Sequence, residues 1–149
     1  MERTLILVKP DGVQRGLTFE ILGRLERRGL KLIGLKLMQV SPELAGHHYR
    51  EHEGKGFYAG LIEYITSAPI VAAVFEGPDA IAAARATMGK TNPVNADAGT
   101  IRGDLAIQTG RNLVHGSDGP ESAAREVALF FKPGELQSYK RALDAWLQE

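Results

Sequence analysis

Hydrophobic positions change their spacing along the chain, and each change predicts an element. Residues 3–8 are a compact run of leucine and β-branched residues that stops at the turn signal K-P-D-G, residues 9–12, which predicts a buried strand. Apolar residues recur at helical spacing over residues 17–28 with arginine and glutamate between them, which predicts an amphipathic helix. Alternation through residues 30–40 predicts a second strand with one wet face.

The second half of the chain repeats this order. Residues 70–76 have the composition of a strand, residues 78–88 form an alanine-rich helical stretch, and residues 127–132 read as a fourth strand bounded by Pro-Gly. The order βαββαβ predicts an α+β fold of the ferredoxin-like type, with a four-stranded antiparallel sheet and helices on one face. Extra helices are expected near residues 43–67 and 136–147.

Composition narrows the class of protein. With 149 residues, 44% of them hydrophobic and 24% charged, the chain is expected to form one domain over residues 1–149. Eighteen basic and eighteen acidic residues give a net charge of zero, so we expect neither nucleic acid nor a membrane as a partner. No cysteine is available for disulfides, and no 18-residue apolar run occurs, so a cytoplasmic location is expected.

Three glycine motifs resemble ligand-binding signatures but depart from them. G-K-T at residues 89–91 lacks the glycine that a P-loop requires at position 84, where the chain has Ala84. The glycines of residues 54–60 are spaced one residue too far apart for a dinucleotide-binding G-x-G-x-x-G. K-G-F at residues 55–57 begins like an RNA-binding signature, but Ala59 stands at the next ring position.

Two histidine patterns have features of metal or hydrolase sites. His48 and His52 are four residues apart, as helix-borne zinc ligands would be, but no third ligand is indicated, so we predict a solvated helix face and no protein metal site. His115, Ser117 and Asp118 have the residue types of a hydrolase triad. They are crowded into four positions, however, whereas triad members converge from separate elements.

The segment around His115 has the features of a nucleophile site. In N-L-V-H-G-S-D, residues 112–118, the histidine lies between apolar residues and a glycine, which favours a rigid ring beside open space. An imidazole with an ordinary pKa of about 6.5 is mostly neutral at pH 7 and can act as a nucleophile. D-G-P-E at residues 118–121 predicts a helix start, with Glu126 about a turn and a half further on.

Several segments together resemble the nucleoside diphosphate kinase family. N-L-V-H-G-S-D-G-P-E-S at residues 112–122 is similar to the active-site segment of that family, and T-I-R-G-D at residues 100–104 to the segment before it. T-L-I-L-V-K-P-D-G-V-Q-R-G at residues 4–16 and G-K-T-N-P at residues 89–93 are similar too, so the resemblance covers essentially the whole chain. It implies transfer of the γ-phosphate of a nucleoside triphosphate to a nucleoside diphosphate, by a ping-pong mechanism through a phosphohistidine on His115.

The resemblance also implies roles for individual residues. Glu126 would orient the His115 ring, which is the logic of orienting acids in other nucleophile sites. The implied catalytic residues are His115, Glu126, Lys9, Tyr49 and Ser117. The implied substrate-binding residues are Lys9, Tyr49, Phe57, Arg85, Thr91, Arg102 and Asn112, with Phe57 as the ring on which the base stacks.

Further expectations concern the cofactor and the assembly. Mg²⁺ is implied because it bridges the β and γ oxygens, with few or no ligands from the protein. A homo-oligomer, expected to be a hexamer, is implied by the family and by the apolar C-terminal residues 144–147. Gly56 replaces a proline common in the family, and Thr109 an apolar residue beside the base, which bears on affinity more than on chemistry.

Two other functions compete with this interpretation. An RNA-binding module of the same fold would bind in a salt-sensitive manner and show no turnover. A regulatory nucleotide-binding protein would keep the pocket without catalysis, but the presence of both His115 and Glu126 argues against it.

Overall fold

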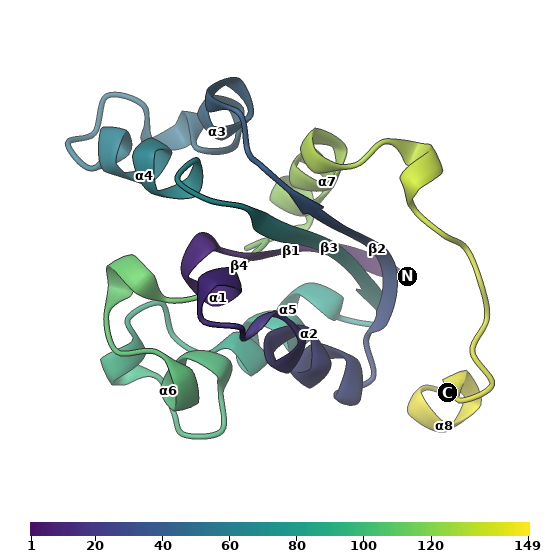
Figure 1. Cartoon of the computed structure of the whole chain (residues 1–149). Helices are drawn as coiled ribbons and strands as arrows, with labels where there is room; N and C mark the ends of the chain where they lie inside the picture. Colours follow the sequence, from purple (N-terminus) through teal and green to yellow (C-terminus); the bar gives the residue numbers. More distant parts are fainter.

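A four-stranded antiparallel sheet forms the centre of the computed structural model, which describes residues 1–149 (Figure 1). The strands are β1 (Glu2–Val8), β2 (Lys31–Met38), β3 (Ile70–Gly77) and β4 (Val114–Gly116). Their order across the sheet is β2-β3-β1-β4, and every neighbouring pair is antiparallel. The predicted ferredoxin-like arrangement is therefore confirmed.

Two helices follow β1 and β3 and cover one face of the sheet. These are α2 (Thr18–Arg27) and α5 (Ala80–Met88), drawn below the sheet in Figure 1. The alternation of β1 sends Ile6 and Val8 to this face, where they join one buried cluster with the apolar residues of both helices. This pair of helices is the one expected from the βαββαβ order.

The opposite face is covered by α3 (Pro42–His48), α4 (Tyr58–Ile65) and α7 (Pro120–Phe130) (Figure 1). Leu5 and Leu7, the alternate residues of β1, belong to a second buried cluster on this face. The sheet is thus packed on both sides, and its edges and loops carry the remaining short elements. These are α1 (Pro10–Gln14), α6 (Ile101–Leu105), α8 (Asp144–Leu147) and the 3₁₀ turns Arg50–His52, Pro93–Asn95, Thr109–Arg111 and Pro133–Glu135.

The fourth strand is not where the sequence predicted it. Residues 127–132 were expected to form that strand, but helix α7 runs through them as far as Phe130. Ala123, Glu126 and Phe130 are its buried residues, at spacings of three and four, so the apolar run lies on the inner face of a helix. The sheet is completed instead by β4, only three residues long, which pairs with β1.

The C-terminal segment also departs from the expectation. Only Asp144–Leu147 is α-helical within residues 136–147, and the preceding chain runs along the β2 side of the sheet, where the Gln137 N–H donates to the Ile33 carbonyl at 2.8 Å (Figure 1). None of the helices has the length and apolar content that a membrane crossing requires.

Candidate active site

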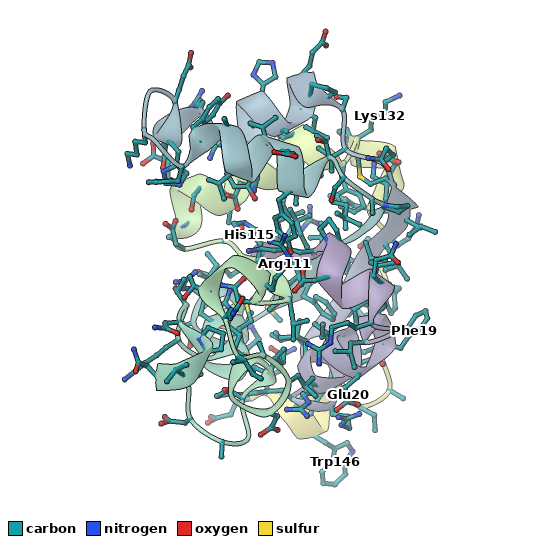
Figure 2. All side chains as sticks on the ribbon, turned by 60° about the vertical axis from the view of Figure 1, so that its left-hand side comes forward. Phe19, Glu20, Arg111, His115, Lys132 and Trp146 are labelled. Atoms are coloured by element: carbon teal, nitrogen blue, oxygen red, sulfur yellow. The ribbon has the colours of Figure 1, made fainter.

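A cavity of about 310 Å³ lies where β4, the end of β1, and helices α3, α5 and α7 come together. Eight of the ten predicted site residues line this cavity, and the two that do not are Phe57 and Ser117. The eight are Lys9, Tyr49, Arg85, Thr91, Arg102, Asn112, His115 and Glu126. Figure 2 shows His115 near the middle of the molecule. A larger groove of about 700 Å³ between α7 and the C-terminal segment contains none of these residues.

His115 is held from one side by a buried carboxylate. In β4 it pairs with Leu7, and its Nε2 lies 3.0 Å from Glu126 Oε1. The His115 side chain is 24% exposed and that of Glu126 only 7%, so the open part of the ring faces away from the carboxylate. Ser117 does not line the cavity, but its hydroxyl donates to the same Glu126 oxygen at 2.7 Å.

The charge of Glu126 selects the state of the ring. Burial alone would raise the pKa of Glu126, but hydrogen bonds from His115 and Ser117 outweigh it and lower the pKa to about 2. An ionised carboxylate can only accept hydrogen bonds, so Glu126 favours the His115 tautomer that has its hydrogen on Nε2. The lone pair then resides on Nδ1, which makes no hydrogen bond to the protein.

Lys9 and Asn112 form the floor of the cavity. Lys9 Nζ donates to Asn112 Oδ1 at 2.8 Å, and Asn112 Nδ2 donates to the Thr91 carbonyl at 2.9 Å. Burial, and next the charge of Arg102, lower the pKa of Lys9 to about 8. A bound anion would raise the pKa of Lys9 again, because it favours the charged ammonium form, so the Lys9 side chain is suited to bind a phosphate.

Arg102 lines the cavity, although its side chain is buried and bonded to the backbone. Its three guanidinium nitrogens donate to carbonyls of Gly89 at 3.0 Å, Asn112 at 3.2 Å and Val114 at 2.6 Å. Burial, then the nearby Arg85, lower its pKa to about 10, so it stays cationic at neutral pH. Arg102 therefore supplies positive charge and fixes the loop at once.

Tyr49 and Phe57 occupy different parts of the site. Burial, then the charge of Glu126, raise the pKa of Tyr49 to about 12, so its hydroxyl is a neutral hydrogen-bond donor. The Phe57 side chain lies outside the cavity and is 54% exposed. Its ring centroid is 5.3 Å from that of His52, which lines the cavity, so Phe57 stands at the mouth.

His48 is a site residue that the sequence did not reveal. The expectation of a solvated face is wrong for it, because His48 is buried and its ring packs edge-on against His115 at 4.8 Å between centroids. Its Nδ1 has no hydrogen-bond partner and lies 4.0 Å from Glu126 Oε2. Burial, then the charge of His115, lower its pKa to about 3 and keep it neutral. The only sequence signal for its burial was that His48 follows the apolar Ala45 by three residues, which places both on one face of a helix.

One group of side chains has metal-ligand geometry. Ligand atoms of His48, His115 and Glu126 lie within 4.8 Å of one another. Two imidazoles and one carboxylate differ from the all-oxygen set that Mg²⁺ prefers, and Glu126 already accepts two hydrogen bonds. Lys9, Arg85, Arg102 and Arg125 line the rest of the cavity against the two carboxylates of Glu51 and Asp118, so positive charge is in excess and the cavity fits phosphate better than a bare cation.

Comparisons with known proteins agree with this chemistry. The sequence model of the family described as nucleoside diphosphate kinase matches residues 2–136. The nucleoside diphosphate kinase of Carboxydothermus hydrogenoformans is 63% identical over 149 residues, which is 100% of both chains, and that of Thermomicrobium roseum is 60% identical, with 99% of both chains covered.

Solved structures agree with the sequence comparisons. A nucleoside diphosphate kinase family protein from Babesia bovis has a TM-score of 0.97 and 46% identity, covering 99% of this chain and 100% of that one. A halophilic nucleoside diphosphate kinase from Halobacterium salinarum, in complex with CDP, has a TM-score of 0.97 and 50% identity, with 99% of both chains covered. The chain therefore belongs to the nucleoside diphosphate kinase family and is a phosphotransferase.

Proposed function

We propose that this enzyme transfers the γ-phosphate of a nucleoside triphosphate to a nucleoside diphosphate through a phosphohistidine on His115. The observation that carries the proposal is the pairing of His115 Nε2 with the buried Glu126, which leaves Nδ1 as the free nitrogen beside a cationic cavity. A neutral imidazole with one fixed tautomer is a nucleophile already aligned for attack.

The first half-reaction uses that free nitrogen. Nδ1 attacks the γ-phosphorus in line with the leaving β-oxygen; the N–P bond forms as the P–O bond breaks, and the nucleoside diphosphate departs with the bonding electrons. The ring gains positive character, which the ionised Glu126 stabilises through the Nε2 hydrogen bond. In the second half-reaction a different nucleoside diphosphate attacks the same phosphorus and restores neutral His115.

The other predicted residues would neutralise and position the phosphates. Lys9, Arg85 and Arg102 place positive charge around the cavity, where phosphoryl transfer needs charge neutralisation more than covalent help. Tyr49 and Thr91 line the same cavity with hydroxyl groups that can donate to phosphate oxygens.

Phe57 would provide the platform for the base at the cavity mouth. Stacking uses the π-face that every base has, so one aromatic ring serves purines and pyrimidines alike. The relative from Halobacterium salinarum was solved with CDP, which supports a diphosphate ligand for this chain as well. Gly56 has open space where a Cβ would stand, so the departure from proline leaves this segment less constrained.

Mg²⁺ completes the proposal as a phosphate-bound ion. When bound with the nucleotide, it would supply positive charge to the phosphates. The nitrogen-rich group around His115 does not suit it, whereas the surplus of cations in the cavity suits the phosphates that would carry it. The residues of the protein then bind the phosphates, not the metal.

A burst experiment tests the proposal. Mixing the protein with a nucleoside triphosphate and Mg²⁺, with no acceptor, should release one nucleoside diphosphate per chain and then stop, because the phosphoryl group stays on the enzyme. Adding any nucleoside diphosphate should discharge it. Turnover that requires both nucleotides at once, with no burst, would contradict the covalent intermediate.

The proposal includes a homo-oligomer, expected to be a hexamer, of single-domain chains acting in the cytoplasm. The edge strand β2, beyond the point where Gln137 bonds Ile33, carries Leu35 and Leu37 at the surface. Phe19 and Trp146 also project outward (Figure 2). Exposed apolar groups on a strand edge are typical of a surface that pairs with another chain. Light scattering should give the mass of an assembly, and a monomer would contradict this part.

A further inference from the structure

A buried turn immediately before His115 has a backbone conformation that is rare for its residue type. Leu113 is fully buried and has a φ of 75°. The Val114 N–H donates to the Asn112 carbonyl at 2.9 Å, so Leu113 is the central residue of a γ-turn with positive φ. This form of γ-turn is strained, and a bulky side chain at positive φ persists only where its surroundings hold it.

Both backbone groups of Leu113 are held by the segment that follows β1. The Lys9 N–H donates to the Leu113 carbonyl at 2.8 Å, and the Leu113 N–H donates to Asp11 Oδ2 at 3.1 Å. The turn lies between Asn112, which binds Lys9 through its side chain, and His115 two residues later. A shift of the turn would therefore displace both the cavity floor and the nucleophile.

The second oxygen of Asp11 connects this turn to another segment. The Tyr64 hydroxyl donates to Asp11 Oδ1, and the Arg111 guanidinium lies 4.5 Å above the Tyr64 ring. Burial, and then this hydrogen bond, raise the pKa of Tyr64, so its hydroxyl stays protonated and remains a donor. Tyr64 is in α4, the helix that begins directly after Phe57.

We propose that Asp11 is a positioning residue: its carboxylate holds the strained turn at Leu113 and ties it, through Tyr64, to the helix that carries the base platform. Asp11 does not line the cavity, so it acts through these partners and does not touch the nucleotide. The inference rests on the proposed phosphohistidine mechanism, because the turn matters for catalysis only if His115 is the nucleophile.

Rapid-mixing measurements of His115 phosphorylation by ATP and Mg²⁺ separate an effect on the position of His115 from an effect on nucleotide binding. The plateau rate reports how His115 is presented, and the half-saturating ATP concentration reports binding. Asp11→Ala should lower the plateau rate at least about tenfold, since misplacing a reacting group by an ångström can cost about a hundredfold. Asp11→Asn should stay within about threefold of the wild type, because an amide can accept from Leu113 and donate to the Tyr64 oxygen.

Two further variants control for a purely structural effect. Glu135→Gln alters a carboxylate that likewise bonds a backbone N–H, of Lys132, and a side chain, of Lys36, outside the site; it should leave both parameters unchanged. Tyr64→Phe should raise the half-saturating ATP concentration about fivefold, the effect of one net hydrogen bond, at an unchanged plateau rate. If Asp11→Ala does not fold, Tyr64→Phe and Asp11→Asn carry the test.

The outcomes distinguish this inference from the proposed function. Wild-type protein that acquires no phosphate on His115 would refute the mechanism itself. Phosphorylation of the wild type together with an unchanged plateau rate in Asp11→Ala would overturn the role of Asp11 alone. Equal damage in Asp11→Asn and Asp11→Ala would also overturn it, because the two hydrogen bonds would then not be what Asp11 contributes, and so would a Tyr64→Phe variant with unchanged half-saturation.

Discussion

The two ends of the cavity are built differently. At the phosphate end, Asn112 and Arg102 are buried, and Lys9 joins them in a network of side-chain and backbone hydrogen bonds. At the base end, Phe57 is half exposed, and Gly54 and Gly56 beside it have open space around them. A covalent transfer needs one geometry for every substrate, whereas a platform for several bases needs only a flat ring.

This difference predicts where substitutions will affect rate and where they will affect binding. Groups at the phosphate end are oriented before substrate arrives, so they need no reorganisation during the reaction. Groups at the base end make few contacts with the rest of the protein. Changes at the first end should therefore lower kcat, and changes at the second should raise KM.

The largest effect is expected for His115→Ala. Every phosphate is routed through one imidazole nitrogen, and no other residue of the cavity can replace it, so phosphate exchange should fall by at least about 10⁴-fold, as in other nucleophile knock-outs. Steady-state assays with ATP and a second nucleoside diphosphate measure this loss. Substantial residual exchange in pure His115→Ala protein would contradict the assignment.

Glu126→Gln should have the next largest effect. The amide keeps the shape of the carboxylate but removes the charge that stabilises the phosphorylated ring, and we expect kcat to fall about 10²-fold, with KM nearly unchanged. Ser117→Ala is the comparison variant, because it keeps the charge of Glu126 and removes the second hydrogen bond to the same oxygen, together with the bond that the Ser117 hydroxyl accepts from the Leu5 N–H; it should cost about tenfold or less. A Ser117→Ala variant as damaged as Glu126→Gln would argue against charge as the cause.

Phe57→Ala should act on binding. Loss of the platform should weaken all nucleotides by about 1 to 3 kcal/mol, similarly for purines and pyrimidines, with little change in kcat. Phe57→Tyr keeps an aromatic face and should bind nearly as the wild type does. A loss confined to one base would show that Phe57 is not a stacking platform.

The last effect concerns stability, and near neutral pH it is small. The pKa of His48 is lowered from 6.5 to about 3 in the folded protein, so between these values the unfolded chain binds a proton that the folded chain does not. Stability should therefore fall as pH drops below about 6.5, by up to about 1.4 kcal/mol per pH unit from this group. In His48→Gln, the free energy of unfolding, measured by denaturant titration at several pH values, should fall less steeply with decreasing pH than in the wild type.

Most of the fold could be predicted because its long elements have clear periods. The first two strands and α2 were bounded correctly by turn residues and by regular spacing. The fourth strand could not be placed, because β4 has only three residues, and an apolar run such as 127–132 fits a strand and the inner face of a helix equally well. Tertiary packing of α7 on the sheet decides between them.

The site was predicted by motif, and the sequence could not supply its buried connections. Arg102 is predicted to contact phosphate, and the motif did not show that its nitrogens also donate to carbonyls of two other segments, one at Gly89 and one at Asn112 and Val114. His48 lies far from His115 in the sequence and reaches it only because α3 packs beside α7. In the sequence, Asp11 was interpreted only as part of a turn signal. Its contacts with Leu113 and Tyr64 form only because three distant segments meet in the folded chain.

The most direct test of the phosphohistidine is to label the protein with ATP carrying a radioactive γ-phosphate. A phosphorus–nitrogen bond should make the label acid-labile and stable to alkali, and the label should be found on His115 and discharge onto any nucleoside diphosphate with Mg²⁺. An acid-stable label, a label on Ser117, or undiminished labelling of His115→Ala would contradict the mechanism.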